Sequence, residues 1–248
     1  MEWWEDIYNR QIYFDTVRAS LFGGTMSQRQ IDGQNAIIND WLRYYRKQGE
    51  KGDNRKLGYM LATTYHETAQ EMWPIEEYGK GQGYSYGEMD PETGQTYYGR
   101  GYVQLTWRDN YADMTQRLGL EGTSQDMEWD AGQALDKDLA ARVMGLGMSQ
   151  GTFRPPHKLM DYFNEVADDP YDARDIINGD KSTVPSWANG VSIGNLIKAY
   201  YMDFTAALNV SETQMPAPSL DGRVVISMNV RAPLGINVRV LVNGAELS

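Results

Sequence analysis

Residues 97–107 read YYGRGYVQLTW, and the interpretation of the whole chain starts from this stretch. It closes a longer segment, residues 79–101, in which seven of 23 residues are glycine. Ten aromatic residues fall between positions 65 and 111. Loops rich in glycine lose much conformational entropy when they are ordered, and such loops often line a binding surface on a rigid scaffold. Composition alone leaves a surface excursion with scattered aromatic anchors equally open.

Helical patterns surround this segment on both sides. Ser27 and Gln30 have the form of a capping box, and apolar residues at helical spacing follow them. Thr106 is expected to cap another helix, which stops at Gly119. The predicted helices cover about 28–47, 57–68, 107–118, 136–149, 171–178 and 192–208. The chain up to about residue 208 is therefore predicted to be mainly helical.

The C-terminal part has a different character. A proline-containing linker at 214–219 precedes alternating apolar residues, which predict a hairpin with strands at 224–231 and 236–242. Two strands alone are marginally stable in water, so this hairpin must pack on the main domain, pair with another copy or dock on a partner. We therefore divide the chain into a helical domain, residues 1–210, and a β appendage, residues 211–248.

Composition and charge exclude several classes of function. The formal net charge is −11, so the chain lacks the basic footprint of a general nucleic-acid binder. It contains no cysteine, which removes disulfide scaffolds, cysteine nucleophiles and thiolate metal sites. No apolar run approaches the 18 or more residues of a membrane span, and the acidic N-terminus does not resemble a signal peptide. Synthesis in the cytoplasm without membrane insertion is the expectation.

The remaining chemistry is that of carboxylates. The only histidines are His66 and His157, and neither the H-E-x-x-H zinc motif nor a G-x-S-x-G elbow is present. We therefore expect no metal and no cofactor. Glu67 lies at the end of an apolar helix, and Glu76 and Glu77 follow it across a proline that ends the helix. Two carboxyl groups on opposite sides of a cleft suit glycoside hydrolysis, although each of them could equally be a solvated surface charge.

The motifs together resemble glycoside hydrolase family 19, which holds plant chitinases and many phage and prophage endolysins. The resemblance rests on His66-Glu67-Thr68, on residues 97–107 with Asn110-Tyr111 after them, and on the segment Ile176-Ile177-Asn178-Gly179. It covers roughly residues 12–208, and its start at residues 18–24 is similar to the lysin-type members. The long segment and disulfides that plant chitinases carry between the two glutamates are absent here.

The resemblance implies a two-lobed, lysozyme-like helical fold with a cleft between the lobes, followed here by the short C-terminal β-hairpin. It implies that Glu67 is the general acid, that a second carboxylate is the general base of an inverting reaction, and that Thr106 helps to hold the attacking water. The base is Glu77 by the spacing of lysin-type members, with Glu76 as an alternative and Glu88 as a weaker one. The residues expected to bind substrate or to orient the acids are His66, Tyr98, Arg100, Gln104, Asn110 and Asn178.

Three aromatic residues near the predicted cleft are open to two readings. Trp73 and Tyr97 are each expected either to stack on sugar or to belong to the hydrophobic core. Trp107 is expected in the core because it starts a packed helix. His66 is expected to be a structural hydrogen-bonding residue beside the acid rather than a catalytic one.

The predicted function is that of a peptidoglycan-degrading endolysin, a muramidase that cleaves between N-acetylmuramic acid and N-acetylglucosamine. Its partners would be glycan strands of the wall, reached after release from the host or as a virion-carried protein, with self-association or docking through residues 222–243. A chitinase of the same fold is the alternative enzyme. A glycan-binding component of a virion or secretion apparatus is the alternative outside enzymes.

Overall fold

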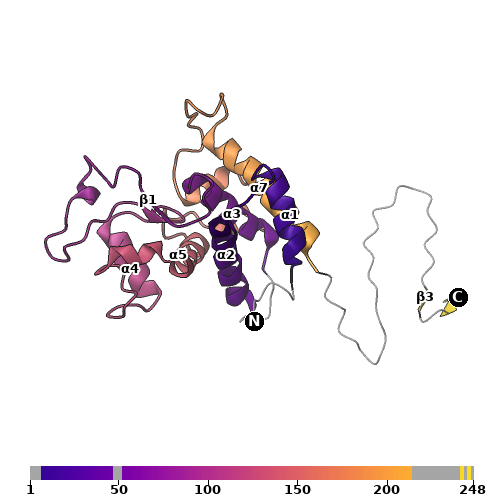
Figure 1. The fold of residues 1–248 in the computed structure, drawn as a ribbon, viewed down its shortest axis with the longest axis horizontal. Helices are drawn as coiled ribbons and strands as arrows, with labels where there is room; N and C mark the ends of the chain where they lie inside the picture. The colour runs from indigo at the N-terminus through magenta and orange to yellow at the C-terminus, as the bar shows by residue number, and fades with distance from the viewer. Residues whose placement is uncertain (1–6, 47–51, 214–240, 243–244, 247–248) are drawn as a thin grey trace. The chain divides into compact units, whose positions relative to one another are not determined.

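The computed structural model describes residues 7–46, 52–213, 241–242 and 245–246, and the text below concerns these residues (Figure 1). The α-helices are α1 (Arg10–Ser20), α2 (Gln28–Arg46), α3 (Asn54–Glu67), α4 (Arg108–Arg117), α5 (Lys137–Gln150), α6 (Leu159–Tyr162) and α7 (Ile193–Ser211). Three 3-10 helices are η1 (Ser85–Gly87), η2 (Ala131–Leu135) and η3 (Asp172–Ile176). Strands β1 (Ile75–Glu76) and β2 (Arg100–Gly101) pair antiparallel, with Ile75 opposite Gly101. No helix of the described ranges is both long and apolar enough to cross a membrane.

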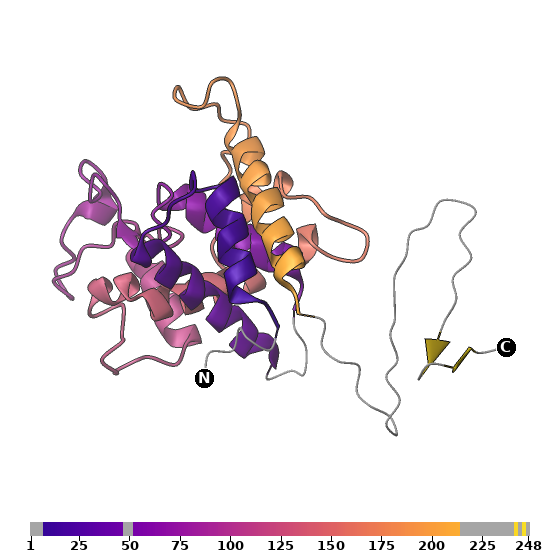
Figure 2. The ribbon, with the colours of Figure 1, turned by 45° about the vertical axis from the view of Figure 1, so that its right-hand side comes forward.

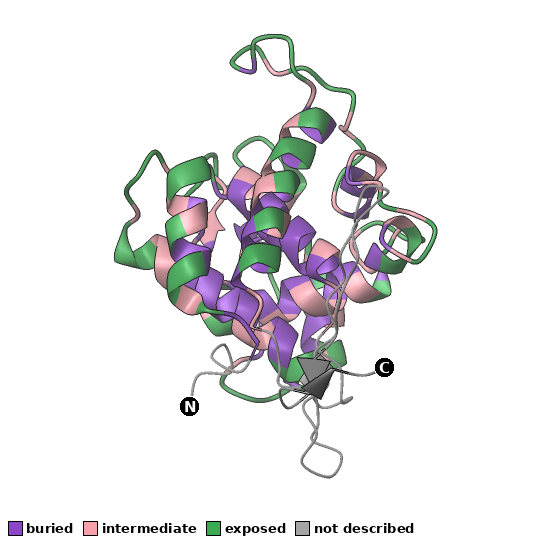
Figure 3. Ribbon diagram, turned by 90° about the vertical axis from the view of Figure 1, so that its right-hand side faces the viewer, coloured by how far each residue is buried: buried purple, intermediate pink, exposed green. Residues whose placement is uncertain are grey.

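Helix α3 is the centre of the larger hydrophobic core. Every residue from Lys56 to Tyr65 is buried, as expected for a helix that other elements surround on all sides. Helices α2, α5 and α7 contact α3, and α1 packs on α7. The burial colouring of Figure 3 shows this interior as a continuous buried region beneath exposed outer faces.

Helix α5 belongs to two hydrophobic cores at once. Ala140, Met144 and Met148 lie in the core around α3, whereas Leu139 and Val143 lie in a smaller core. The smaller core also contains buried side chains of α4, η2 and the loops beside them, namely Tyr97, Leu105, Tyr111, Met114, Leu120, Met127, Ala131 and Ala134. The two cores define two lobes. In Figure 1, α5 lies between α4 on one side and α2 and α3 on the other, and Figure 2 shows the same ribbon turned by 45°. The predicted two-lobed, mainly helical fold is confirmed.

The chain reverses sharply between α3 and β1. Ala69, Gln70 and Met72 adopt φ values of 48°, 71° and 51°, a left-handed conformation that costs free energy in residues other than glycine. The hydroxyl of Thr68 donates to the carbonyl of Thr64 at 2.7 Å and accepts the Met72 N–H at 3.0 Å. These bonds hold the turn that brings β1 back beside the end of α3.

A glycine of α2 lets this turn pack directly on the helix. A Cβ atom at Gly33 would lie 1.6 Å from the carbonyl oxygen of Met72. No side chain fits in that space, so α2 and the turn are in backbone contact. The position of β1, which follows the turn, depends on this contact.

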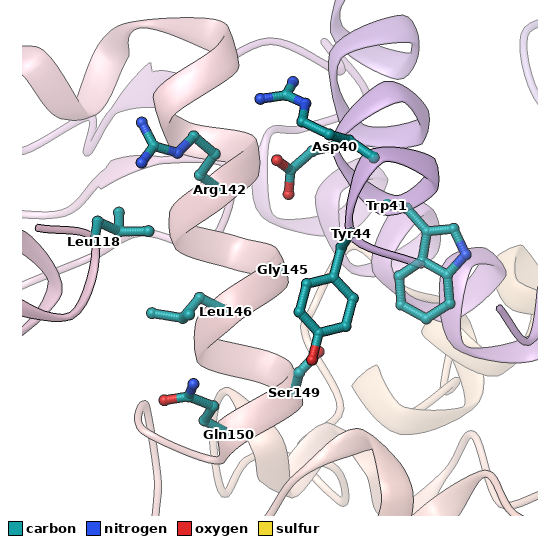
Figure 4. A pocket seen from close by; sticks show the side chains of 10 residues that line it. Asp40, Trp41, Tyr44, Leu118, Arg142, Gly145, Leu146, Ser149 and Gln150 are labelled. Atoms are coloured by element: carbon teal, nitrogen blue, oxygen red, sulfur yellow. The ribbon is translucent and has the colours of Figure 1, made fainter. Parts of the chain in front are cut away.

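A groove of about 300 Å³ runs between α2 and α5 on another face of the molecule (Figure 4). Asp40 and Tyr44 approach it from α2, and Leu146 lines it from α5. A Cβ atom at Gly145 would lie 3.1 Å from Oδ2 of Asp40, so the missing side chain lets the two helices approach closely. The groove is separate from the cavity that contains Glu67.

Most of the predicted helices are present with small shifts at their ends. The capping box at α2 forms as expected, because Ser27 and Gln30 exchange hydrogen bonds of 2.8 and 3.2 Å. The segment predicted as a helix at 171–178 is the 3-10 helix η3, and α1 was not anticipated. Trp107, not Thr106, occupies the N-cap position of α4, with φ 76° and no side-chain capping bond.

Residues 213–248 form a second unit. Within it, β3 (Leu241–Val242) and β4 (Ala245–Glu246) pair antiparallel, with Leu241 opposite Glu246. The linker at 214–219 and the predicted strand at 224–231 lie outside the described residues. The same holds for most of the segment 222–243 that was expected to dock or self-associate.

The backbone contact at Gly33 predicts a large effect of a small substitution. Gly33→Ala should lower the free energy of unfolding by about 1–3 kcal/mol, because the added methyl group displaces the turn at Met72. Gly145→Ala is the matched control on a helix, since its neighbour is the end of a flexible side chain and alanine favours helix by up to ~1 kcal/mol. Urea unfolding of both variants gives the comparison. A Gly33→Ala protein as stable as the parent would show that the turn is fixed by other contacts.

Candidate active site

A cavity of about 390 Å³ lies where the two lobes meet. The polar and aromatic residues that line it come from the end of α3, the glycine-rich loop, the segment before α4, α4 itself, the segment after α5 and the segment after η3. They are Glu67, Tyr86, Gln104, Thr106, Trp107, Asn110, Phe153 and Asn178. Five of the residues singled out in the sequence, from positions as far apart as 67 and 178, therefore line one cavity.

A buried arginine, Arg174, binds the carboxylate of Glu67. The guanidinium of Arg174 donates from Nη1 to Oε1 of Glu67 and binds Asp180 through Nε and Nη2, at 2.6 and 3.1 Å. Only 3% of the Arg174 side chain is exposed. Burial alone would lower the pKa of Arg174, but the charges of Glu67 and Asp180 outweigh it and raise that pKa. The arginine is therefore a permanent cation that fixes one oxygen of Glu67.

Glu77 does not line this cavity itself but contacts Tyr86, a residue that does. Its Oε1 lies 3.4 Å from the hydroxyl of Tyr86, which lines the cavity, and its Oε2 accepts the Gly99 N–H at 3.2 Å. A Cβ atom at Gly99 would lie 3.4 Å from Oγ1 of Thr106. Glu77 and Thr106 thus lie on either side of the same glycine, and no cation of the described residues forms an ion pair with Glu77.

Glu76 has a different environment, although it is the neighbouring residue. Its carboxylate forms an ion pair of 2.8 Å with Lys80 and accepts a hydrogen bond from the Tyr98 hydroxyl, with Arg100 at 3.9 Å. The hydrogen bonds from Lys80 and Tyr98 lower the pKa of Glu76. Glu76 is therefore held as a structural anion, whereas Glu77 keeps only neutral donors.

The segment before α4 is strained where it lines the cavity. Gln104 and Trp107 have φ values of 56° and 76°, and such values in residues other than glycine gather at functional sites. The Thr106 hydroxyl donates to the carbonyl of Gln104 at 2.8 Å, and Asn110 donates to the carbonyl of Thr106 at 2.7 Å. The Gln104 amide lies 3.4 Å from the carbonyls of β1 and β2 residues. These bonds give the Thr106 hydroxyl a fixed direction.

Exposed aromatic rings flank the cavity. Tyr84 and Tyr86 stack with centroids 5.1 Å apart, and the Tyr86 ring meets Trp107 edge-on at 5.0 Å. The core position expected for Trp107 is wrong, because half of this residue is exposed and its positive φ turns it away from the helix interior. His66 is the residue before Glu67, and the centre of its ring lies 6.5 Å from the centre of the exposed Trp187 ring. Burial lowers the pKa of His66, so the imidazole is neutral at neutral pH.

Some predicted site residues lie behind the cavity rather than in it. Tyr98 and Arg100 are buried, and the Arg100 guanidinium packs 3.7 Å from the centre of the Tyr98 ring. Arg100 also donates to the carbonyl of Thr96 at 2.8 Å. Asn178 lines the cavity and donates to Asp180 at 3.1 Å. Tyr97 is buried in the smaller core, and Trp73 carries the guanidinium of Arg29 over its ring.

Sequence reasoning missed Arg174 and Asp180. They flank the segment Ile176-Ile177-Asn178-Gly179, which was noted for its resemblance alone. A signal was available, because two charged residues border an apolar pair in a segment that the resemblance places at the site. The ion pair of Arg174 with Glu67 spans more than 100 residues, so no local sequence pattern indicates it.

The region described in the structure holds no cluster of three or more histidine, aspartate or glutamate residues that could bind a metal ion.

Comparison with known proteins shows the fold of a chitinase. No model of a known protein family matches the chain. A crystal structure of a chitinase C mutant has a TM-score of 0.52 at 17% identity, over 84% of this chain and 96% of that one. Chitinase C from Streptomyces griseus gives a TM-score of 0.49 at 20% identity, over 70% of this chain and 83% of that one. The chain thus shares the fold expected from the resemblance.

A curated relative also matches over part of the sequence. Acidic endochitinase SP2 of Beta vulgaris is 34% identical over 122 residues, which are 44% of this chain and 42% of the relative. The chain therefore spans less than half the length of the curated relative that it matches.

The buried ion pair at Glu67 predicts a stability effect. Arg174→Met should lower the free energy of unfolding by about 3–5 kcal/mol, because it leaves Glu67 and Asp180 without their cation. Arg154→Met is the control, since Arg154 pairs with Asp175 at the surface, where a single ion pair contributes about 1 kcal/mol or less. Equal losses in the two variants, measured by urea unfolding, would contradict this account of Arg174.

The ion pairs of Glu76 predict a pH dependence of stability. Because the folded-state pKa is lowered, Glu76 stabilises the fold above its unfolded pKa of about 4.3, and this stabilisation is lost as the pH falls through the folded value. The difference in unfolding free energy between the parent and Glu76→Gln should be constant above about pH 5.5 and shrink toward pH 3. Urea unfolding of both proteins between about pH 3 and pH 7 gives the comparison, and a difference that does not change with pH would contradict this account of Glu76.

Proposed function

We propose that the chain is a glycoside hydrolase that cleaves β-1,4-linked glycans of N-acetylated hexosamines with inversion at the anomeric carbon. The observation that carries this proposal is that Glu67 lines the cavity and Glu77 lies one hydrogen bond away from a residue that lines it. Glu67 ends α3, and Glu77, which follows β1, lies 3.4 Å from the Tyr86 hydroxyl and accepts the Gly99 N–H at 3.2 Å. The chitinase fold and the partial match to an endochitinase support it.

In this mechanism Glu67 is the general acid. Arg174 binds its Oε1, and no hydrogen bond from the described residues reaches Oε2, which is therefore available to carry the proton. Glu67 gives that proton to the glycosidic oxygen as the bond from this oxygen to the anomeric carbon breaks. Arg174 then stabilises the carboxylate that remains, because the guanidinium is charged throughout.

Glu77 is the general base in this proposal. It takes a proton from a water molecule whose oxygen attacks the anomeric carbon from the face opposite the leaving group. The Thr106 hydroxyl lies close to Gly99, whose N–H Glu77 accepts, and donates its own proton to the Gln104 carbonyl, so it accepts a hydrogen bond from the same water. Glu76 is unsuited to this role, because its carboxylate is already engaged by Lys80 and Tyr98.

The flanking aromatic rings would bind the sugar chain. Sugar rings present apolar C–H faces, and exposed aromatic side chains bury them effectively. Exposed rings offer such faces at two edges of the cavity. Trp107 and Tyr84 lie at one edge, and Trp187 lies beside His66 at the other. The amides of Asn110 and Asn178 would meet the polar edges.

Peptidoglycan is the substrate that we propose. The turn from α3 to β1 is short, so no long segment stands between the two glutamates. An uncovered cleft has room for the lactyl ether and the peptide that muramic acid carries, whereas chitin needs no such room. Chitin is the second candidate, because the matched relative and the structural neighbour are chitinases by name.

The setting that we propose is the bacterial cell wall, with glycan strands as partners. Release during phage lysis, or carriage on a virion, would bring the chain there. A binding protein without activity is the less favoured reading, because Glu67 and Thr106 line one cavity and Glu77 contacts Tyr86, which lines it too.

The catalytic roles are tested with three glutamate variants. Glu67→Gln and Glu77→Gln should each lower the rate on sacculi by about 10²- to 10⁴-fold, the usual contribution of a general acid or base. Glu76→Gln should keep most of the activity and lose stability instead. Mass spectrometry of the new ends identifies the bond, and NMR of the first product should show the inverted anomer.

Parallel digests of sacculi and chitin oligomers separate the two substrates. New reducing muramic-acid ends would support the muramidase. Cleavage of chitin alone would establish the second candidate. Binding of sacculi without any cleavage would contradict the enzyme proposal.

A further inference from the structure

A second hollow lies against β1, which ends at Glu76, and against the residues that follow it. It has a volume of about 490 Å³ and is lined by Arg29 of α2, by Trp73 and Ile75 beside it, by Glu76 and Lys80, and by Leu135 of η2. Glu77 also borders it, but its carboxylate is directed to Gly99 and Tyr86. The hollow therefore adjoins the cavity of the candidate active site across β1.

The charged side chains around this hollow are Arg29, Glu76, Glu77 and Lys80, and of these Arg29 is the cation that forms no ion pair with a described residue. Lys80 and Glu76 neutralise each other at 2.8 Å, and Arg100 adds a further positive charge at 3.9 Å from Glu76. No carboxylate of the described residues forms an ion pair with Arg29. In a chain of net charge −11, this leaves one cationic side chain open to an anion directly beside the cleft.

The surroundings of Arg29 suit a bound carboxylate. Its guanidinium lies 5.0 Å from the centre of the Trp73 ring, which holds it in place without using its hydrogen-bond donors. A guanidinium offers two parallel N–H donors that match the geometry of a carboxylate. Ile75 and Leu135 provide an apolar floor for the carbon chain that would carry such a group.

We propose that this hollow binds a carboxylate on the side arm of muramic acid, which includes the stem peptide of peptidoglycan. This inference rests on the proposed function, since it names what distinguishes peptidoglycan from chitin at the same site. A peptide spans about 3.3–3.6 Å per residue when extended, so two or three residues cross the width of a strand and its side chains. Chitin carries no carboxylate and would gain nothing from Arg29.

Binding to an inactive protein tests the proposal. In a Glu67→Gln background, Arg29→Gln is compared with its parent by isothermal titration calorimetry. The ligands are a tetrasaccharide muropeptide, the same glycan after amidase treatment, which leaves lactyl carboxylates, and chitin tetrasaccharide. Arg29→Gln should weaken the muropeptide about tenfold, the usual loss for a charged hydrogen bond, and change chitin binding less than about twofold.

The three ligands identify which carboxylate is bound. Weaker binding of the muropeptide alone assigns the site to a carboxylate of the stem peptide. Weaker binding of the amidase-treated glycan alone assigns it to the lactyl carboxylate, which is an amide in the intact muropeptide, and weaker binding of both shows that the hollow takes either carboxylate. Equal weakening of all three ligands, or no weakening of any, would overturn the proposal. Arg43→Gln, an exposed arginine of the same helix, is the charge-matched control and should leave all three affinities unchanged.

This test is independent of the hydrolysis experiment. An enzyme that cleaves only chitin, yet binds muropeptide through Arg29, would contradict the proposed substrate and retain the carboxylate site. Cleavage of sacculi with unchanged affinities in Arg29→Gln would support the proposed substrate and contradict the carboxylate site.

Discussion

The two-sided burial of α5 is the constraint on which the arrangement of the site depends. One face of this helix packs into the core around α3, and the opposite face packs into the core around α4 and η2. Close-packed interiors transmit displacement rather than absorb it. Neither lobe can therefore shift without disturbing α5, and the carboxylates that the two lobes carry stay in register across the cavity.

Each lobe also uses one buried arginine to fix a glutamate. Arg174 holds Glu67 in the larger lobe, and Arg100 stacks on Tyr98 close to Glu76 in the smaller lobe. A buried cation is costly unless it is paired and hydrogen-bonded. Arg174 meets this condition with Glu67 and Asp180, and Arg100 donates to the carbonyl of Thr96 and stacks on the Tyr98 ring. As a consequence, the adjacent residues Glu76 and Glu77 have different environments. Glu76 is anchored, and Glu77 is left with neutral partners that a water molecule can join.

The helices and the residues of the site could be predicted from the sequence, but the orientation of the site residues relative to one another could not. Amphipathic spacing and a capping box place α2 within a residue of its observed end, because these signals are local. Glu76 and Glu77 could not be told apart, since the choice depends on Lys80 and Tyr98 on one side and on Gly99 and Tyr86 on the other. Those partners are fixed only when β1 pairs with β2.

Two further misjudgements have the same cause. Trp107 was assigned to the core by its place at the start of a helix, whereas its positive φ turns the ring to the surface. Arg174 was missed because its partner is more than a hundred residues away. Backbone conformations outside the usual regions, and ion pairs between distant segments, leave little trace in composition or periodicity. Unusual backbone conformations and long-range ion pairs are both found close to this site, as is common at functional sites.

The strongly acidic composition sets a limit on how this molecule can recognise its ligand. A chain of net charge −11 gains no long-range attraction to an anionic bacterial envelope. Screening over about 8–10 Å at ordinary ionic strength confines any helpful charge to groups that touch the ligand. Arg100, Arg108 and Arg174 are already committed to internal carboxylates or carbonyls. Recognition must then rest on the exposed rings around the cavity and on the single unmatched guanidinium beside β1, which act only after contact. Such a surface favours a ligand that is abundant and extended, because each encounter depends on concentration and contact area rather than on electrostatic steering.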